Sequence, residues 1–338
     1  MRSTEIIPLV DTGNHLRISE FDLIRHYFSD LSYGAATVIT GVGDDAAIIG
    51  GDCDTNQVVT VDTLNAGVHF FADDKPEDIA RKAVLVNLSD LAAMGAEPQW
   101  ITLSLTLPDA DQGWIKRFSQ GLRSVLKDYR ISLVGGDTCR GEHLSISIQA
   151  SGKVPVGQAV LRSAAKPGEK IYVTGFLGDA GAGLMIRQGK IKALHPETGD
   201  YLMHRLYAPS PRISFAMSIR NMASAGIDVS DGLLADLGHI LEASHVGAEL
   251  DIGQLPLSKP LLAQMGLDQA RNLAMTAGED YELCFTAPAQ ASEKIRLLAE
   301  AQRLPVRCIG QITTGSGLVA SLDGQTFCLP EQGGYRHF

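Results

Sequence analysis

The sequence predicts a protein of the α/β class with two domains, each built from layers of strands and helices (α+β layers). Its 338 residues exceed one ordinary domain, and 45% of them are apolar against 20% charged, enough to bury two large cores. Proline and glycine cluster between residues 153 and 168, where we place the domain boundary. We therefore expect an extension over residues 1–17, a first domain over 18–152 and a second domain over 153–338.

The first half mixes strands with long amphipathic helices. Ser19 suits the N-cap of a first helix, and a later helix is framed by Pro76 in its first turn and Gly95 after its end. Runs rich in β-branched residues indicate strands. The expected helices span 19–28, 76–94 and 111–129, and the expected strands span 38–40, 57–61, 100–107, 131–134 and 144–150.

The second half begins with an expected strand over 170–174, which runs into a glycine-rich segment over 175–183 and a further helix. Other helices are expected near 199–207, 210–224, 232–245 and 290–302, and strands near 226–229, 281–286, 306–312 and 317–322. No short-period repeat or low-complexity tract is present.

Charge and cysteine content narrow the function classes. The formal net charge is -10 without any run of Lys or Arg, so nucleic acid and anionic membranes are poor candidate partners. We find neither a signal peptide nor a stretch of about 18 apolar residues that would span a bilayer. The five cysteines are far apart and form no C-x-x-C pair, which favours reduced thiols in the cytoplasm. If the substrates are polyanions, divalent cations must lie between them and the carboxylates.

The functional signal of this sequence lies in its acidic motifs. The sequence has no G-x-x-x-x-G-K-[ST], G-x-G-x-x-G, H-E-x-x-H or G-x-S-x-G motif. Asp44 and Asp45 are adjacent carboxylates between two apolar runs, and they repel each other unless positive charge is bound. Thr60 and Asp62 face the same way on an expected strand and suit a hard cation. Taken singly, each motif also fits an ordinary polar turn or a strand-end aspartate.

Asp90 gives the strongest local signal for a bound metal. It lies in a stretch of the 76–94 helix that is apolar nearly all round, and Asn87 shares its face. No Lys or Arg lies within a turn of Asp90, and a buried carboxylate without a partner is costly. A metal ion is the simplest compensation, and hydrogen bonds to backbone amides are the alternative.

Three further motifs place carboxylates next to apolar strands. Gly135-Gly136-Asp137-Thr138 lets backbone N–H groups approach a phosphate. Asp228, Ser230 and Asp231 follow the same design, with an N-cap as the alternative role of Asp231. Gly278-Glu279-Asp280-Tyr281-Glu282 is alternatively a charged turn. One arrangement explains all of them: several Mg²⁺ ions held by aspartates, with phosphates as the remaining ligands, which suits phosphoryl transfer.

In order and spacing these motifs resemble the thiamine-monophosphate kinase family. The resemblance rests on residues 41–45, 86–95, 135–138, 228–232, 278–283 and 334–338, and single pieces also resemble the aminoimidazole ribonucleotide synthetase and selenophosphate synthetase superfamily. It implies a two-domain aminoimidazole ribonucleotide synthetase-like fold and a homodimer whose first-half sheets join across the interface. The implied activity is ATP-dependent, direct in-line phosphorylation of thiamine monophosphate to thiamine diphosphate.

The resemblance also implies roles for individual residues. The metal ligands would be Asp45, Thr60, Asp62, Asp90, Asp137, Asp228 and Asp231, with Asp45, Asp90, Asp137 and Asp231 as the catalytic set. The ATP contacts would be Gly136, Asp137, Arg162 and Ser230, and the thiamine site would be lined by His69, Glu279 and Tyr335. A carboxylate suits the cationic thiazolium ring, and an aromatic side chain suits a flat cation.

Two other functions stay open at this level. A related ATP-dependent synthetase would act on a formyl-amidine or a selenium species. Selenophosphate synthetases need an early reactive cysteine in a glycine-rich loop, whereas Cys53 lies in a Thr/Asn/Asp loop after the Asp44-Asp45 motif, which argues against that activity. A non-enzymatic scaffold would gain nothing from burying Asp90.

Overall fold

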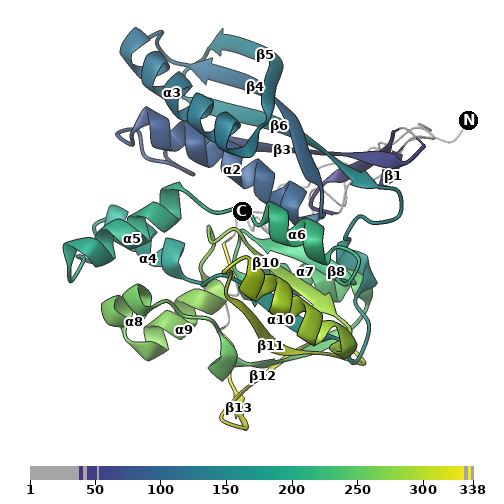
Figure 1. Ribbon diagram of the computed structural model, residues 1–338. Coiled ribbons are helices and arrows are strands. Elements are labelled where there is room, and N and C mark those ends of the chain that lie inside the picture. The colour runs from purple at the N-terminus through teal and green to yellow at the C-terminus, as the bar shows by residue number, and fades with distance from the viewer. Residues whose placement is uncertain (1–37, 41–43, 52, 331–333, 336–338) are drawn as a thin grey trace, which may run out of the picture.

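The computed structural model describes residues 38–40, 44–51, 53–330 and 334–335. The first half lies above the second, and helix α2 (Pro76–Ala93) lies between them (Figure 1). The expected extension over 1–17, the helix over 19–28, the glycine segment over 41–43 and the tail over 336–338 lie outside the described residues.

The first sheet contains six strands within the described ranges, in the order β1-β2-β3-β6-β4-β5. The neighbours pair antiparallel except β4 and β5, which are parallel and are connected by helix α3 (Gln112–Tyr129), a crossover that parallel strands require. The strands are β1 (Val38–Thr40), β2 (Ala47–Gly50), β3 (Thr55–Asn65), β4 (Glu97–Leu107), β5 (Ser132–Arg140) and β6 (Ser145–Pro155).

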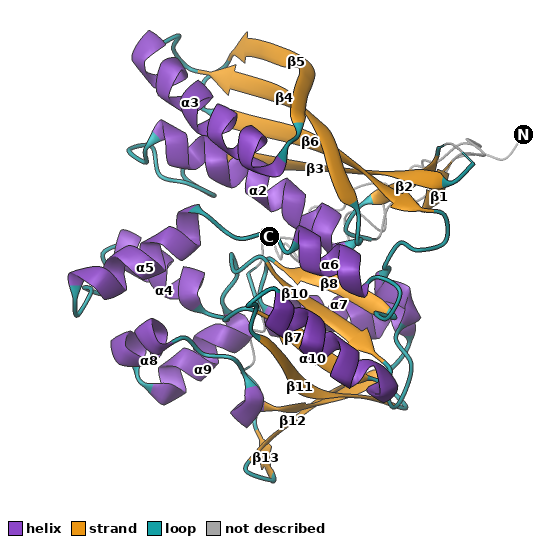
Figure 2. Cartoon of the chain, viewed as in Figure 1, coloured by secondary structure: helices purple, strands orange, loops and turns teal. Residues whose placement is uncertain are grey.

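Helices α2 and α3 cover one face of this sheet, and no labelled helix covers the other (Figure 2). The all-round burial expected for α2 is confirmed: Leu88, Leu91 and Met94 are fully buried. The reason is its position, since α2 contacts β3 and β6 of the first sheet and also β8 and α6 of the second half. α3 approaches α2 closely at Gly121, where a Cβ atom would lie 2.4 Å from the carbonyl oxygen of Glu77.

Strand β5 differs from the expectation. The sequence predicted a strand over 131–134 that ends in a flexible glycine pair, but the strand continues to Arg140 and includes Gly135 and Gly136. Tertiary pairing with β4 explains the difference, because the two strands run side by side for the whole length of β5. Gly136 is required there, since a Cβ atom would lie 1.9 Å from the carbonyl oxygen of Leu103.

The second sheet contains seven strands among the described residues, in the order β13-β12-β9-β11-β7-β10-β8. All neighbours pair antiparallel except β9 and β12. The strands are β7 (Lys170–Thr174), β8 (Ala225–Val229), β9 (Gly247–Asp251), β10 (Glu282–Ala287), β11 (Val306–Thr313), β12 (Gly317–Leu322) and β13 (Gln325–Phe327). Ile171, Val173 and Ile227 of the central strands are fully or almost fully buried in the core of this half.

The helices of the second half form two groups, one against the sheet and one beside it (Figure 1). They are α4 (Asp179–Arg187), α5 (Pro196–Tyr207), α6 (Ile213–Ile219), α7 (Leu233–Ser244), α8 (Lys259–Met265), α9 (Leu267–Thr276) and α10 (Ser292–Ala301). The group of α4, α5, α8 and α9 has a small core of its own around Leu202 and Leu261. None of the helices within the described ranges is long and apolar enough to cross a membrane.

Candidate metal and nucleotide site

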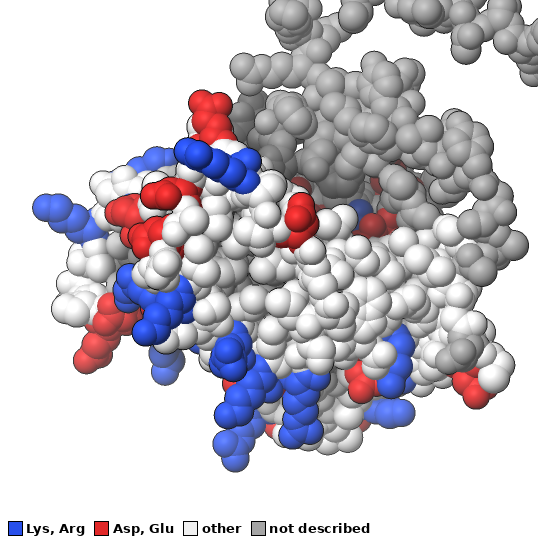
Figure 3. All heavy atoms as spheres, turned by 90° about the horizontal axis from the view of Figure 1, so that it is seen from above, with Lys and Arg blue, Asp and Glu red and all other residues white. Residues whose placement is uncertain are grey.

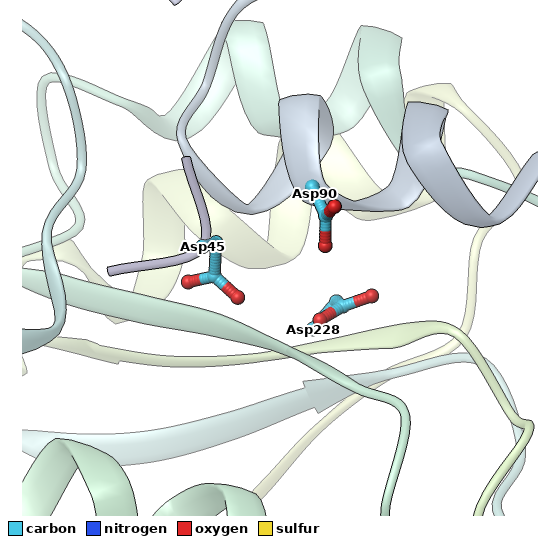
Figure 4. Close-up of side chains that lie close together, drawn as sticks. All are labelled: Asp45, Asp90 and Asp228. Carbon is cyan, nitrogen blue, oxygen red and sulfur yellow. The ribbon is translucent and has the colours of Figure 1, made fainter. Parts of the chain in front are cut away.

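Three carboxylates from distant parts of the chain converge beneath α2. Asp45 follows β1, Asp90 is on α2 and Asp228 is on β8, and their carboxylates point toward one another (Figure 4). Within the described residues, these three side chains offer ligand oxygens that all lie within 4.8 Å of one another. We call them the acidic cluster. It lies where the two halves of the chain meet, because β8 belongs to the second sheet.

Removal from water and mutual repulsion make the acidic cluster electrostatically unfavourable by itself. Burial raises the pKa of the Asp90 carboxyl well above its usual value, and the charges of Asp62, Asp228 and Asp45 raise it further. Burial and then the charge of Asp45 raise the pKa of Asp228 in the same way. Within the described residues, Asp228 Oδ2 is buried and accepts no hydrogen bond. A cation would satisfy these groups.

Strand β3 places Thr60 and Asp62 beside the cluster, on the same strand face as expected. The Thr60 hydroxyl donates a hydrogen bond of 2.6 Å to Asp90 Oδ2. The backbone N–H of Asp62 donates to Asn87 Oδ1 over 3.1 Å, and Asn87 Nδ2 donates to the carbonyl oxygen of Ala83. The side-chain amide of Asn87, which lies on α2, therefore links β3 to that helix.

Arg162 brings positive charge to the cluster. Its guanidinium donates to both carboxylate oxygens of Asp45, over 3.1 Å from Nε and 2.9 Å from Nη2. Its backbone N–H donates to Asp44, and Ser244 Oγ donates to its carbonyl oxygen over 2.7 Å. Burial, followed by the charge of Asp45, raises the pKa of Asp44 to about 6. Arg162 thus occupies both carboxylate oxygens of Asp45, the atoms through which Asp45 would bind a metal ion.

The segment after β8 shows a residue that the sequence analysis missed. Asp236 accepts hydrogen bonds from the backbone N–H groups of Asp231, over 3.1 Å, and Gly232, over 3.0 Å. The backbone N–H groups just before α7 are therefore bound by the Asp236 side chain. The alternative role of Asp231 as the N-cap of this helix is not observed among the described residues. Burial and the charges of Asp231 and Asp228 raise the pKa of Asp236, so Asp231 lies near enough to act on it. An acidic residue in the first turn of an expected helix was the available signal.

Two of the residues assigned to the thiamine site are anchored to the segment Ser230–Asp231. The backbone N–H of Glu279 donates to the Ser230 carbonyl oxygen over 2.8 Å, and that of Tyr335 donates to the Asp231 carbonyl oxygen over 2.9 Å. His69 lies in the loop after β3, where its Nδ1 accepts the Asn65 N–H over 3.0 Å. The structure thus places Glu279 and Tyr335 next to residues assigned to ATP and metal.

The alternative interpretation of the segment 278–282 as a charged turn is wrong for Asp280 and Glu282, which are fully buried. Asp280 accepts the backbone N–H groups of Gly178 and Ala180 at the start of α4. Burial raises its pKa to about 8, although those hydrogen bonds act in the opposite direction. Glu282 accepts hydrogen bonds from Thr174, Arg205 and Arg212, so it joins several elements of the second half.

Gly136 and Asp137 lie away from the acidic cluster within one chain. They are exposed on β5, which is separated from β3 by β4 and β6. Three strand spacings correspond to roughly 14 Å. Asp137 and Asp62 of the same chain are therefore too far apart to bind one metal ion.

Both halves of the chain match known domain families. Residues 43–154 match the N-terminal domain of AIR synthase related proteins, and residues 166–323 match their C-terminal domain. These two matches define a two-domain protein of the AIR synthase related class. The aminoimidazole ribonucleotide synthetase-like fold expected from the sequence is confirmed.

Curated relatives narrow this class. The thiamine-monophosphate kinase of Escherichia coli strain K12 is 45% identical over 320 residues, which cover 94% of this chain and 98% of that protein. The protein of the same name from Bacillus subtilis strain 168 is 35% identical over 331 residues, which cover 95% and 100%. The chain belongs to the thiamine-monophosphate kinase family.

Solved structures agree with this assignment. The crystal structure of thiamine-monophosphate kinase from Stenotrophomonas maltophilia K279a has a TM-score of 0.77 and 44% identity, covering 87% of this chain and 93% of that one. AaThiL complexed with AMPPCP and TMP has a TM-score of 0.80 and 32% identity, covering 95% and 97%. The HypE-HypF complex, with 18% identity and a TM-score of 0.71, shares the fold alone.

Proposed function

We propose that this protein transfers a phosphoryl group from ATP to thiamine monophosphate and releases thiamine diphosphate and ADP. The observation that carries the proposal is the acidic cluster at the junction of the two halves, in a member of this family. AaThiL complexed with AMPPCP, an ATP analogue, and TMP supports both substrates, because that chain is 32% identical over 95% of this one.

The residues present fit Mg²⁺ ions. Carboxylates within 4.8 Å of one another, one with a buried oxygen that lacks a hydrogen-bond partner among the described residues, are hard oxygen ligands that need a cation. We propose Asp45, Asp90 and Asp228 as the core ligands, with Thr60, Asp62 and Asp231 beside them. When bound, Mg²⁺ neutralises the negative charge of the phosphates between which transfer occurs.

The side chains of the protein then have to position the two phosphates between which the phosphoryl group moves. An oxygen of the acceptor phosphate forms a bond to the γ-phosphorus of ATP, while the bond from that phosphorus to the β,γ-bridging oxygen breaks and ADP leaves. This in-line step needs no side-chain nucleophile. Arg162 supplies a guanidinium that binds phosphate oxygens in place of Asp45, and Ser230 lies at the end of β8 where the nucleotide would approach Asp228.

We expect the thiamine moiety to bind beside the segment Ser230–Asp231. Glu279 and Tyr335 are held next to Ser230 and Asp231, so a ligand that they bind lies close to the phosphates. The Glu279 carboxylate suits the cationic thiazolium ring or the aminopyrimidine, and the Tyr335 ring suits a flat cation. His69, in the loop after β3, would contribute to this site from the first half of the chain.

We further propose a homodimer that pairs the first-half sheets. β5 ends its sheet among the described residues, and Leu133 and Val134 on it are 43% and 59% exposed. Val61, on the β3 face opposite to Thr60, is 62% exposed. Seen from above, the charged side chains gather mainly along the left and lower edges of this face, and a broad central area carries few of them (Figure 3). An exposed strand edge that carries apolar side chains favours pairing with a second copy.

The proposed dimer gives Gly136 and Asp137 their role. Because they are exposed on β5 and distant from β3 of their own chain, we place them at the nucleotide site of the partner subunit. Light scattering should give a solution mass near twice the chain mass of 36.1 kDa. A mass equal to one chain at micromolar concentration would contradict this proposal.

The cytoplasm is the proposed location. All five cysteines are free, one of them buried and four exposed, as expected for a reducing compartment. Neither nucleic acid nor a membrane is proposed as a partner, because the chain has a formal net charge of -10.

The direct test is an assay of the purified protein with ATP, Mg²⁺ and thiamine monophosphate. We expect thiamine diphosphate and ADP in equal amounts. If no product forms at high enzyme concentration, the proposal fails. ADP release with a formyl-amidine or selenium species, but not with thiamine monophosphate, would favour a related synthetase instead.

A further inference from the structure

Lys82 on α2 is a buried cation that neither the sequence motifs nor the acidic cluster explains. Its side chain is 3% exposed, and burying an ammonium group is costly unless the group is paired. Its Nζ lies 2.6 Å from Glu279 Oε2 and donates to the carbonyl oxygen of His69 over 3.0 Å. Lys82 therefore connects two residues of the thiamine site, one from each half of the chain.

The contact with Lys82 places an ammonium group at one oxygen of the Glu279 carboxylate. Glu279 has a φ of +74°, a backbone conformation that is unfavourable for a non-glycine residue and that recurs at functional sites. Its Oε2 is buried and accepts no hydrogen bond among the described residues, so the contact with Lys82 is an ion pair; the side chain as a whole is 23% exposed. Lys82 thus pairs with the buried oxygen, and the side chain keeps some exposure at which a ligand could reach it.

The His69 loop is held by the same ammonium group. Lys82 binds the carbonyl oxygen, and the backbone N–H of His69 donates to the carbonyl oxygen of Asn65 over 3.0 Å. Because Nδ1 of the ring accepts the Asn65 N–H, a neutral His69 carries its proton on Nε2. The His69 backbone and the Glu279 carboxylate therefore contact the same ammonium group.

We propose that Lys82 is a positioning residue for the acceptor. Its ammonium holds Glu279 and the His69 loop together across the two halves, so that the thiamine moiety binds in one orientation with its phosphate toward the acidic cluster. The inference rests on the proposed function, since it concerns the same acceptor. Arg162 and Ser230, which are assigned to ATP, make no contact with Lys82 among the hydrogen bonds and ion pairs of the described residues.

The test is Lys82→Met, which keeps the aliphatic stem and removes the charge. We expect the KM for thiamine monophosphate to rise about 10-fold to 100-fold, because a small displacement of a binding group has an effect of this order. The KM for ATP should change less than about threefold. Lys82→Arg, which can still pair with a carboxylate, should recover most of the loss.

Two further variants complete the design. Glu279→Gln should raise the same KM, and the loss in the double variant Lys82→Met/Glu279→Gln should be smaller than the product of the two single losses, because the two changes share one contact. Lys116→Met, at an exposed position of α3, is the matched control and should change neither KM. If Lys82→Met does not fold, Lys82→Gln replaces it, since the amide still donates to His69.

The outcomes separate this inference from the proposed function. Calorimetric titration of wild type and variants with thiamine monophosphate measures binding without turnover. Equal affinity of wild type and Lys82→Met, or an equal rise of both KM values, would overturn the role of Lys82 and leave the kinase assignment intact. A wild type that neither binds nor phosphorylates thiamine monophosphate would overturn both.

Discussion

Replacing Asp90 by asparagine is expected to reduce phosphorylation of thiamine monophosphate by about 10²-fold to 10³-fold or more. The change removes one charge from the acidic cluster but keeps an oxygen that accepts the Thr60 hydroxyl, so the local packing is preserved. The loss should appear both in turnover and in the Mg²⁺-dependent binding of ATP. Steady-state kinetics and calorimetry with an ATP analogue measure the two effects.

Stability should change in the opposite direction to activity. The raised pKa of Asp90 means that its ionised form destabilises the fold at neutral pH. In chelator, Asp90→Asn should therefore melt at the same temperature as wild type or higher. Asp109→Asn, in an exposed turn after β4, is the control and should leave activity unchanged. If Asp90→Asn were more stable and also kept Mg²⁺-dependent ATP binding, the metal site would be assigned wrongly.

Removing the Glu282 carboxylate is expected to destabilise the protein more than any other change considered. Glu282 is fully buried and binds Arg205, Arg212 and the Thr174 hydroxyl. Glu282→Ala leaves two guanidinium groups in the interior without this partner, and breaking a buried ion pair costs about 3–5 kcal/mol. Domains are stable by only about 5–15 kcal/mol, so the melting temperature should fall by roughly 10 °C or more.

Thermal and chemical unfolding measure this effect. The matched control is Glu293→Ala, which removes a glutamate that also pairs with an arginine, but on the exposed surface of α10. Its melting temperature should stay close to that of wild type, since exposed ion pairs contribute little. Equal melting temperatures for the two variants would show that the Glu282 network does not stabilise the fold.

The elements with strong periodic patterns were predicted correctly from the sequence. α2 and α3 were expected over 76–94 and 111–129 and span Pro76–Ala93 and Gln112–Tyr129. β9, α8 and α9 were not assigned, because they are short and depend on neighbours for burial. Ser258 and Pro260 were available signals for α8, since the Ser258 hydroxyl accepts the Leu261 N–H at the start of that helix.

The candidate site was only partly accessible to sequence reasoning. A carboxylate in an apolar helix, such as Asp90, stands out from its neighbours. The partners of such groups do not, because contacts across long sequence separations follow from the fold: Lys82 and Glu279 are far apart in the chain, as are Arg162 and Asp45. For the same reason Asp137 looked equivalent to Asp62, although the sheet order separates their strands.

The central claim is that the acidic cluster binds nucleotide through Mg²⁺ at the junction of the two halves. Calorimetric titration of the wild-type protein with AMPPCP, in millimolar Mg²⁺ and again in chelator, tests it most directly. We expect saturable binding with Mg²⁺ that is lost in chelator and lost in Asp90→Asn. Equal affinity with and without Mg²⁺, retained in Asp90→Asn, would contradict it.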